Sequence, residues 1–211
     1  MKKLELRENI QIPSYVREQF QVLYSNICLS EKNPHIICLT GADQGCGTSL
    51  IAWQLACTIA THGKKVLLLD CDMRNSSLPG LLGYEAGVTG LSEIMDMKSS
   101  PSKAMYTTEL KNLFLMPTGT IPENPGMLFR KQDFEDLLES LASVMDYVII
   151  DTPAVTVAGD VLTIAPECDA SLIVLAAGEL MKEEAKERIQ SLKACGGHFL
   201  GIILNKAESG V

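Results

Sequence analysis

The sequence predicts an α/β fold in which helices flank a doubly wound and mostly parallel sheet. Two observations predict it: short continuous apolar runs that are rich in Ile, Leu and Val, and helical patterns that alternate with these runs. Continuous apolar runs are typical of strands that are covered on both faces of a parallel sheet. Strands that alternate with helices require crossover connections, and these wind the chain over both faces of the sheet.

Six apolar runs are expected to form buried strands. They span residues 35–40, 65–70, 112–116, 147–151, 170–176 and 199–204. Between them, residues 50–61 are apolar and rich in Ala, and residues 133–144 carry apolar side chains on one helical face. Residues 179–194 also have helical spacing and end just before Gly196, which suits the end of a helix. Each of these three stretches is therefore expected to be a helix.

A further helix is expected ahead of the first strand, over residues 14–29. Its apolar positions Val16, Phe20, Leu23 and Ile27 are spaced to pack the helix against its own domain. The economical division is an N-terminal helical extension over residues 1–33, followed by one α/β domain over residues 34–211.

Composition narrows the class of protein. The chain has 211 residues, of which 46% are hydrophobic and 21% are charged, a mixture typical of globular domains. The net charge of −8 argues against nucleic acid as a partner, since such binding requires a basic face. The expected location is cytoplasmic. No apolar run approaches the roughly 20 residues that span a bilayer, the N-terminus lacks a signal-peptide pattern, and the seven cysteines form no C-x-x-C pair.

A glycine-rich segment, TGADQGCGTS over residues 40–49, lies between the first strand and an apolar helix. Such a loop can turn backbone N–H groups toward a phosphate at the helix N-terminus. The P-loop signature is G-x-x-x-x-G-K-[ST]. Here Ala42 stands in the first glycine position, Gly47 in the second, Thr48 in the lysine position and Ser49 in the last. The alternative is a tight strand-to-helix turn that binds nothing.

Acidic residues follow two of the expected strands. Asp70 and Asp72 come at the end of the second strand, and Asp151 ends the fourth. Ligands bind at the carboxyl ends of strands in open α/β sheets, where carboxylates can hold magnesium and orient a reacting group. A lone Asp in such a position could instead cap a helix, but two such ends beside a glycine loop favour a nucleotide site.

Several segments together resemble the bacterial tyrosine kinase family, within the MinD/ParA group of deviant-Walker P-loop ATPases. Residues 65–79 (KVLLLDCDMRNSSLP) are similar to the family's Walker A′ segment, and residues 147–153 (YVIIDTP) are similar to its Walker B strand. The other matching segments are 119–128 (GTIPENPGML), 201–206 (GIILNK), Gly90-Leu91-Ser92 and Asp160. The resemblance covers nearly the whole chain. It implies a P-loop NTPase fold and ATP-dependent tyrosine phosphorylation in the regulation of capsular or exopolysaccharide biosynthesis.

The resemblance also implies ATP or ADP with Mg²⁺ as cofactors. The implied nucleotide-binding residues are Gly45, Cys46, Gly47, Thr48, Ser49, Arg74 and Asn205, the implied metal ligands are Ser49, Asp70 and Asp151, and the implied catalytic residues of an active enzyme are Asp70 and Asp72. The implied partner is a membrane-anchored polysaccharide co-polymerase or activator, through which a cytoplasmic protein would reach the membrane.

The departures from the family pattern bear on activity. Thr48 replaces the P-loop lysine, and Asp43 stands where MinD/ParA relatives carry a second lysine. Gln21 and Tyr24 replace both arginines of an E-x-x-R-x-x-R motif that docks subunits into a ring, and no tyrosine cluster precedes Val211. These losses favour a pseudokinase-like protein that is a monomer or dimer instead of an octameric ring. The alternatives are an active tyrosine kinase and a MinD/ParA-like ATPase switch.

Cys46 lies in the glycine loop beside a helix N-terminus, a position that can make a thiol reactive. The alternative is that Cys46 fills a tolerant loop position, as most cysteines without a charged partner do.

Overall fold

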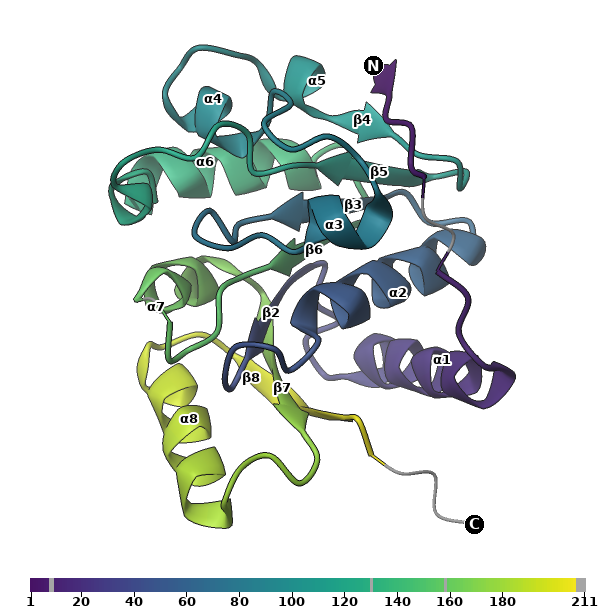
Figure 1. The fold of residues 1–211 in the computed structure, drawn as a ribbon, viewed down its shortest axis with the longest axis vertical. Helices are drawn as coiled ribbons and strands as arrows, with labels where there is room; N and C mark the ends of the chain where they lie inside the picture. The colour runs from purple at the N-terminus through teal and green to yellow at the C-terminus, as the bar shows by residue number, and fades with distance from the viewer. Residues whose placement is uncertain (8–9, 130, 158, 208–211) are drawn as a thin grey trace.

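The computed structural model describes residues 1–7, 10–129, 131–157 and 159–207 (Figure 1). Its eight-stranded sheet has the order β1-β4-β5-β3-β6-β2-β7-β8. The strands are β1 (Lys2–Lys3), β2 (Ile36–Gly41), β3 (Val66–Asp70), β4 (Tyr106–Thr107), β5 (Leu113–Met116), β6 (Tyr147–Asp151), β7 (Ala170–Ala176) and β8 (Phe199–Asn205). Every pairing is parallel except that of β4 with β5, which confirms the predicted mostly parallel sheet.

Helices cover both faces of the sheet, as the predicted doubly wound architecture requires. In Figure 1, α1 and α2 lie on one side of the strands, and α7 and α8 lie on the other. The helices are α1 (Ser14–Leu29), α2 (Thr48–Thr61), α3 (Leu78–Leu82), α4 (Leu91–Met95), α5 (Pro101–Ala104), α6 (Lys131–Ala142), α7 (Asp160–Ile164) and α8 (Lys182–Ala194), with 3₁₀ turns η1 (Pro125–Met127) and η2 (Ala165–Glu167).

The central strands explain the continuous apolar runs. In β3, consecutive residues Leu67, Leu68 and Leu69 are all fully buried, so both faces of the strand are covered. At the edge of the sheet the pattern differs, because Ile202 and Leu204 of β8 are 50% and 60% exposed. All six predicted strands are present, each within one residue of its predicted ends.

Two strands and some helix ends differ from the sequence prediction. The strands β1 and β4 were not predicted, because a two-residue strand has no periodicity and exists only through its pairing partner. The helix predicted from residue 179 begins at Lys182, because the Glu184 carboxylate accepts the Met181 N–H at 3.0 Å and caps the helix there. The helix predicted from residue 50 begins at Thr48, directly after Gly47.

The helix α1 packs on the α/β domain as predicted. Ile27 is fully buried and Phe20 is 9% exposed, while Val16 and Leu23 are partly buried against the same core. Tyr24 is also buried, and its ring contacts the ring of Tyr147 with centroids 6.0 Å apart. The side chain in one of the two docking-arginine positions therefore points into the protein.

None of the helices in the described ranges has the length and apolar character that crossing a membrane requires.

The burial of α1 predicts that it unfolds together with the sheet. Ile27→Ala should lower the free energy of unfolding by about 2–5 kcal/mol, the usual cost of truncating a buried side chain. The matched variant Val22→Ala, at a position 53% exposed on the same helix, should change it by less than about 0.5 kcal/mol. Urea denaturation measures both values, and equal effects would show that α1 lies outside the cooperative unit.

Candidate functional site

The glycine loop connects β2 to α2 at the carboxyl edge of the sheet. Gly45 and Gly47 have φ values of 84° and 85°, in the left-handed region that side chains other than glycine rarely adopt. At Gly47 a Cβ atom would also clash with Nδ2 of Asn205. The first turn of α2, which begins at Thr48, presents N–H groups that have no partner within the helix. This local structure suits the binding of an anion such as phosphate.

A cavity of about 690 Å³ opens beside the loop. Its lining consists of Asp43, Gln44, Gly45, Gly47, Thr48, Ser49, Leu50, Asp72, Asn75, Ser76, Ser77, Gly80, Leu81, Thr152, Ala154 and Val157. Among these described residues, Asp43 and Asp72 carry the charged side chains, and Lys, Arg and His are absent. The structure thus brings five of the predicted site residues (Gly45, Gly47, Thr48, Ser49 and Asp72) to one cavity.

Asp70 and Asp151 lie at the ends of the adjacent strands β3 and β6, where they are register partners. Asp70 is fully buried, and its carboxylate accepts hydrogen bonds from the Asp72 N–H at 3.1 Å and from the Ser76 hydroxyl. Burial, followed by repulsion from Asp151, raises the pKa of Asp70 well above its ordinary value.

Asp151 differs from Asp70 in its lack of hydrogen bonds. It is 1% exposed, and within the described residues neither of its carboxylate oxygens has a hydrogen-bond partner. Burial raises its pKa to about 7, and the nearby Ser49 hydroxyl offsets part of this rise although it lies outside hydrogen-bond geometry. A buried carboxylate without partners beside a serine hydroxyl suits a divalent cation.

The donor set fits Mg²⁺ that is bound together with a nucleotide. Over the described ranges, no group of three or more His, Cys, Asp and Glu side chains is placed to hold a metal ion. Mg²⁺ usually takes only one or two carboxylates and fills its other positions with phosphate oxygens and water. Asp151 and Ser49 could supply the protein ligands, whereas both Asp70 oxygens already accept hydrogen bonds.

Asp72 lines the cavity, and its side chain stabilises the turn that follows β3. Its Oδ1 atom accepts the N–H groups of Arg74 at 3.2 Å and Asn75 at 2.9 Å. Burial raises the pKa of Asp72, and these two N–H donors offset part of the rise. This carboxylate is held by the backbone at the cavity wall, where it could contact a bound ligand or metal.

Arg74 forms an ion pair with Asp160. Its guanidinium donates to both oxygens of Asp160, through Nε at 2.8 Å and Nη2 at 3.2 Å. Asp160 is 5% exposed, and a Cβ atom on Gly126 would lie only 2.9 Å from its Oδ1. The pair thus joins the segment after β3 to α7 and to the 119–128 loop. Arg74 does not line the cavity, so its predicted contact with the nucleotide stays a prediction.

Asn205 contacts the backbone of the glycine loop at Cys46. The Asn205 Nδ2 atom donates to the Cys46 carbonyl at 2.8 Å, which ties the end of β8 to the loop. The Cys46 side chain is only 2% exposed, and its Sγ accepts the Asp43 N–H at 3.4 Å. This burial favours the interpretation that Cys46 fills space within the loop.

One contact of the loop was not foreseen from the sequence. The Arg188 Nε atom of α8 lies 3.8 Å from Asp43 Oδ1, where it faces the loop with a positive charge. The two residues are far apart along the chain, and Arg188 lies in an ordinary charged helical pattern. No local signal could have identified this contact.

Known proteins are similar to this chain in sequence and in fold. A family model described as ParA: NUBPL iron-transfer P-loop NTPase matches residues 32–209. Tyrosine-protein kinase CpsD of Streptococcus pneumoniae serotype 4 is 34% identical over 212 residues, covering 100% of this chain and 93% of that protein. The chain belongs to the bacterial tyrosine kinase family of ParA-type P-loop NTPases.

Other members of the family agree in sequence and in fold. Tyrosine-protein kinase YwqD of Bacillus subtilis is 31% identical over 190 residues, covering 89% of this chain and 80% of that protein. The chimerical protein CapA2B2 superposes with a TM-score of 0.87 at 28% identity, covering 98% and 96% of the two chains. The kinase domain of Escherichia coli ETK gives a TM-score of 0.85 at 25% identity, covering 97% and 85%.

The raised pKa of Asp151 predicts a pH-dependent stability. An unfolded chain releases this proton near pH 3.8, whereas the folded protein keeps it up to about pH 7, so the free energy of unfolding falls as pH rises between these values. Without magnesium, Asp151→Asn should therefore stabilise the protein by about 2–4 kcal/mol near pH 8 and by little near pH 4.

Denaturant titrations at both pH values, with a chelator present, measure this difference. Glu139→Gln, which removes an exposed carboxylate of α6, is the matched control and should have little effect at either pH. An Asp151→Asn variant that is destabilised equally at both pH values would contradict the prediction.

Proposed function

We propose that this chain acts in capsular or exopolysaccharide biosynthesis as a pseudokinase-like member of its family, with impaired ATP-dependent tyrosine autophosphorylation. The observation that carries the proposal is the charge of the nucleotide cavity. Thr48 occupies the position of the P-loop lysine, and no Lys, Arg or His stands among the described residues that line the cavity.

The missing charge matters most for phosphoryl transfer. The P-loop lysine contacts the β- and γ-phosphates and stabilises charge that shifts during the reaction. Removing one preorganised donor typically lowers the rate by about 10²–10³, and a full charge is a stronger donor. The Thr48 hydroxyl lies against the loop itself, since a Cβ atom on Gly41 would be 2.8 Å from Thr48 Oγ1. It offers no charge to a phosphate.

The nearby arginines do not compensate in this arrangement. Asp160 holds the Arg74 guanidinium through two hydrogen bonds, and Arg188 faces Asp43. An arginine or lysine contributed by a partner or by a second copy could restore activity. That alternative, an active tyrosine kinase, is favoured by the acidic residues Asp70, Asp72 and Asp151, which remain in place, and by the names of the relatives.

Binding of a nucleotide requires less than catalysis. The left-handed glycines Gly45 and Gly47 and the start of α2 suit a phosphate, and Ser49 with Asp151 suits Mg²⁺. We therefore expect this chain to bind a Mg²⁺–nucleotide with little turnover. A MinD/ParA-like ATPase switch would need turnover as well, and the same missing charge argues against it.

The partner and the location follow from the family resemblance and from α1. We propose that a membrane-anchored polysaccharide co-polymerase or activator brings this protein to the cytoplasmic face of the membrane. The buried Tyr24 cannot act as an exposed docking arginine, and Gln21 carries no charge. Subunit contacts of the ring type are therefore weakened, which supports a monomer or dimer.

Restoring the lysine tests the main proposal. Thr48→Lys should raise the affinity for Mg²⁺–ATP by at least about ten-fold, because it adds one positive charge to the phosphate site. Thr48→Met, which is similar in length but uncharged, should not raise it. Isothermal titration calorimetry measures both affinities. An unchanged affinity in Thr48→Lys would contradict the view that this loop is a phosphate site that has lost its cation.

The oligomeric state is tested by light scattering on the purified chain. At micromolar concentration we expect a mass of one or two chains of 22.9 kDa, because both docking positions lack arginine. A stable ring with a mass of many chains would contradict this expectation.

A further inference from the structure

We infer that the cavity favours a nucleoside diphosphate with Mg²⁺ over the corresponding triphosphate, and that Asp43 determines this preference. The inference rests on the proposed binding of a Mg²⁺–nucleotide at the glycine loop and concerns which nucleotide the loop selects.

The distribution of charge around the cavity is the first observation. Asp43 and Asp72 line it. The buried Asp70 and Asp151, at the ends of β3 and β6, are close to the lining residues Asp72 and Ser49. No basic side chain is found among the described lining residues. A triphosphate carries more negative charge than a diphosphate, so its additional phosphate enters a region where the nearest fixed charges are of the same sign.

The loop and the adjacent strand ends still provide groups that can bind one terminal phosphate and its metal ion. The N–H groups at the start of α2 and the turn at Gly45 and Gly47 can bind one phosphoryl group. The two Asp151 oxygens, buried and without hydrogen-bond partners in the described part of the chain, point to a cation as an independent ligand of the same site. A diphosphate with Mg²⁺ uses all of these groups and needs no further positive charge.

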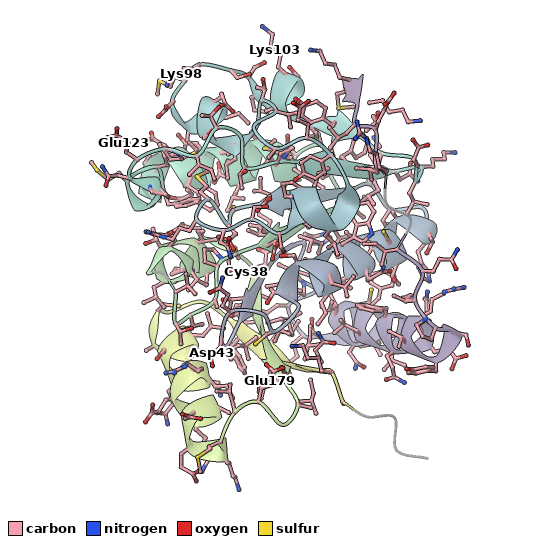
Figure 2. The ribbon with its side chains drawn as sticks, viewed as in Figure 1. Cys38, Asp43, Lys98, Lys103, Glu123 and Glu179 are labelled. Atoms are coloured by element: carbon pink, nitrogen blue, oxygen red, sulfur yellow. The ribbon has the colours of Figure 1, made fainter. Side chains whose placement is uncertain are left out.

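Asp43 is the acidic residue that lies within the loop itself. Figure 2 shows it at the end of the loop that is close to α8. Its side chain is 35% exposed, and its Oδ1 atom lies 3.8 Å from Arg188 Nε, longer than a strong charge-assisted hydrogen bond. Arg188 does not line the cavity, so it balances the Asp43 charge only partly and from outside. Part of the carboxylate's field therefore reaches the phosphate site.

The two members of this pair predict opposite effects on selectivity. Asp43→Asn removes the negative charge at the loop and should reduce the preference for the diphosphate. Arg188→Gln removes the balancing positive charge and should increase that preference. If the pair merely held the loop in shape, both substitutions would disturb the same contact and would shift nucleotide binding in the same direction.

The experiment is calorimetric titration of the full chain with Mg²⁺–ADP and with a non-hydrolysable Mg²⁺–ATP analogue. For the unmodified protein we expect the diphosphate to bind at least about ten-fold more tightly. Asp43→Asn should bring this ratio closer to one, Asp43→Lys should abolish or reverse it, and Arg188→Gln should enlarge it. Glu139→Gln, which removes an exposed carboxylate far from the loop in sequence, is the control and should leave the ratio unchanged.

Several outcomes would overturn the inference. Equal or tighter binding of the triphosphate analogue would overturn it and leave the proposed nucleotide binding standing. Shifts in the same direction for Asp43→Asn and Arg188→Gln would also overturn the inference. An Asp43→Asn variant whose ratio of diphosphate to triphosphate affinity equalled that of Glu139→Gln would overturn it as well. If calorimetry detected no binding of either nucleotide, and neither nucleotide changed the midpoint of urea unfolding, the proposed nucleotide site itself would fail.

Discussion

Two carboxylates buried side by side at the ends of β3 and β6 are the constraint on which the site depends. Asp70 and Asp151 are register partners with almost no exposure. Burial raises the pKa of both carboxyl groups, with repulsion from Asp151 adding to the rise at Asp70 and repulsion from Asp72 adding to the rise at Asp151. Asp70 is satisfied by Ser76 and by a backbone N–H group, whereas Asp151 lacks partners in the described structure. A folded protein tolerates such a group when a proton or a cation neutralises it, and the second case supports the proposed metal site at this edge of the sheet.

Two arginine side chains near this edge of the sheet are paired with acidic residues. Arg74 is bound by Asp160, and this pair also packs against Gly126 in the loop after β5. Arg188 of α8 faces Asp43 of the glycine loop. Each arginine thus joins two segments of the fold. Since Thr48 stands in the lysine position of the loop, the proposed phosphate site would take its positive charge from backbone N–H groups and from a metal ion.

Sequence patterns predicted six strands of the sheet well but missed β1 and β4, which lie at one of its edges. The strand β6 begins and ends as predicted, because it is a continuous apolar run that is buried on both faces. The helix α1 does as well, because it is a long segment with one periodic apolar face. The two-residue strands β1 and β4 could not be predicted, because they are stabilised by pairing and not by their own side chains. The start of α8 depends on one side-chain cap, which shifted it by three residues from the expected position.

The sequence alone determined the α/β architecture, the place of the glycine loop and the presence of Thr48 in the lysine position, because each of these follows from residues that are adjacent in the chain. Only the tertiary structure decided which carboxylates lack partners, that Cys46 and Tyr24 are buried, and that Asp160 and Arg188 face Arg74 and Asp43. These contacts join residues from different strands and helices. Their geometry follows from how the layers pack, which no local pattern of residue types contains.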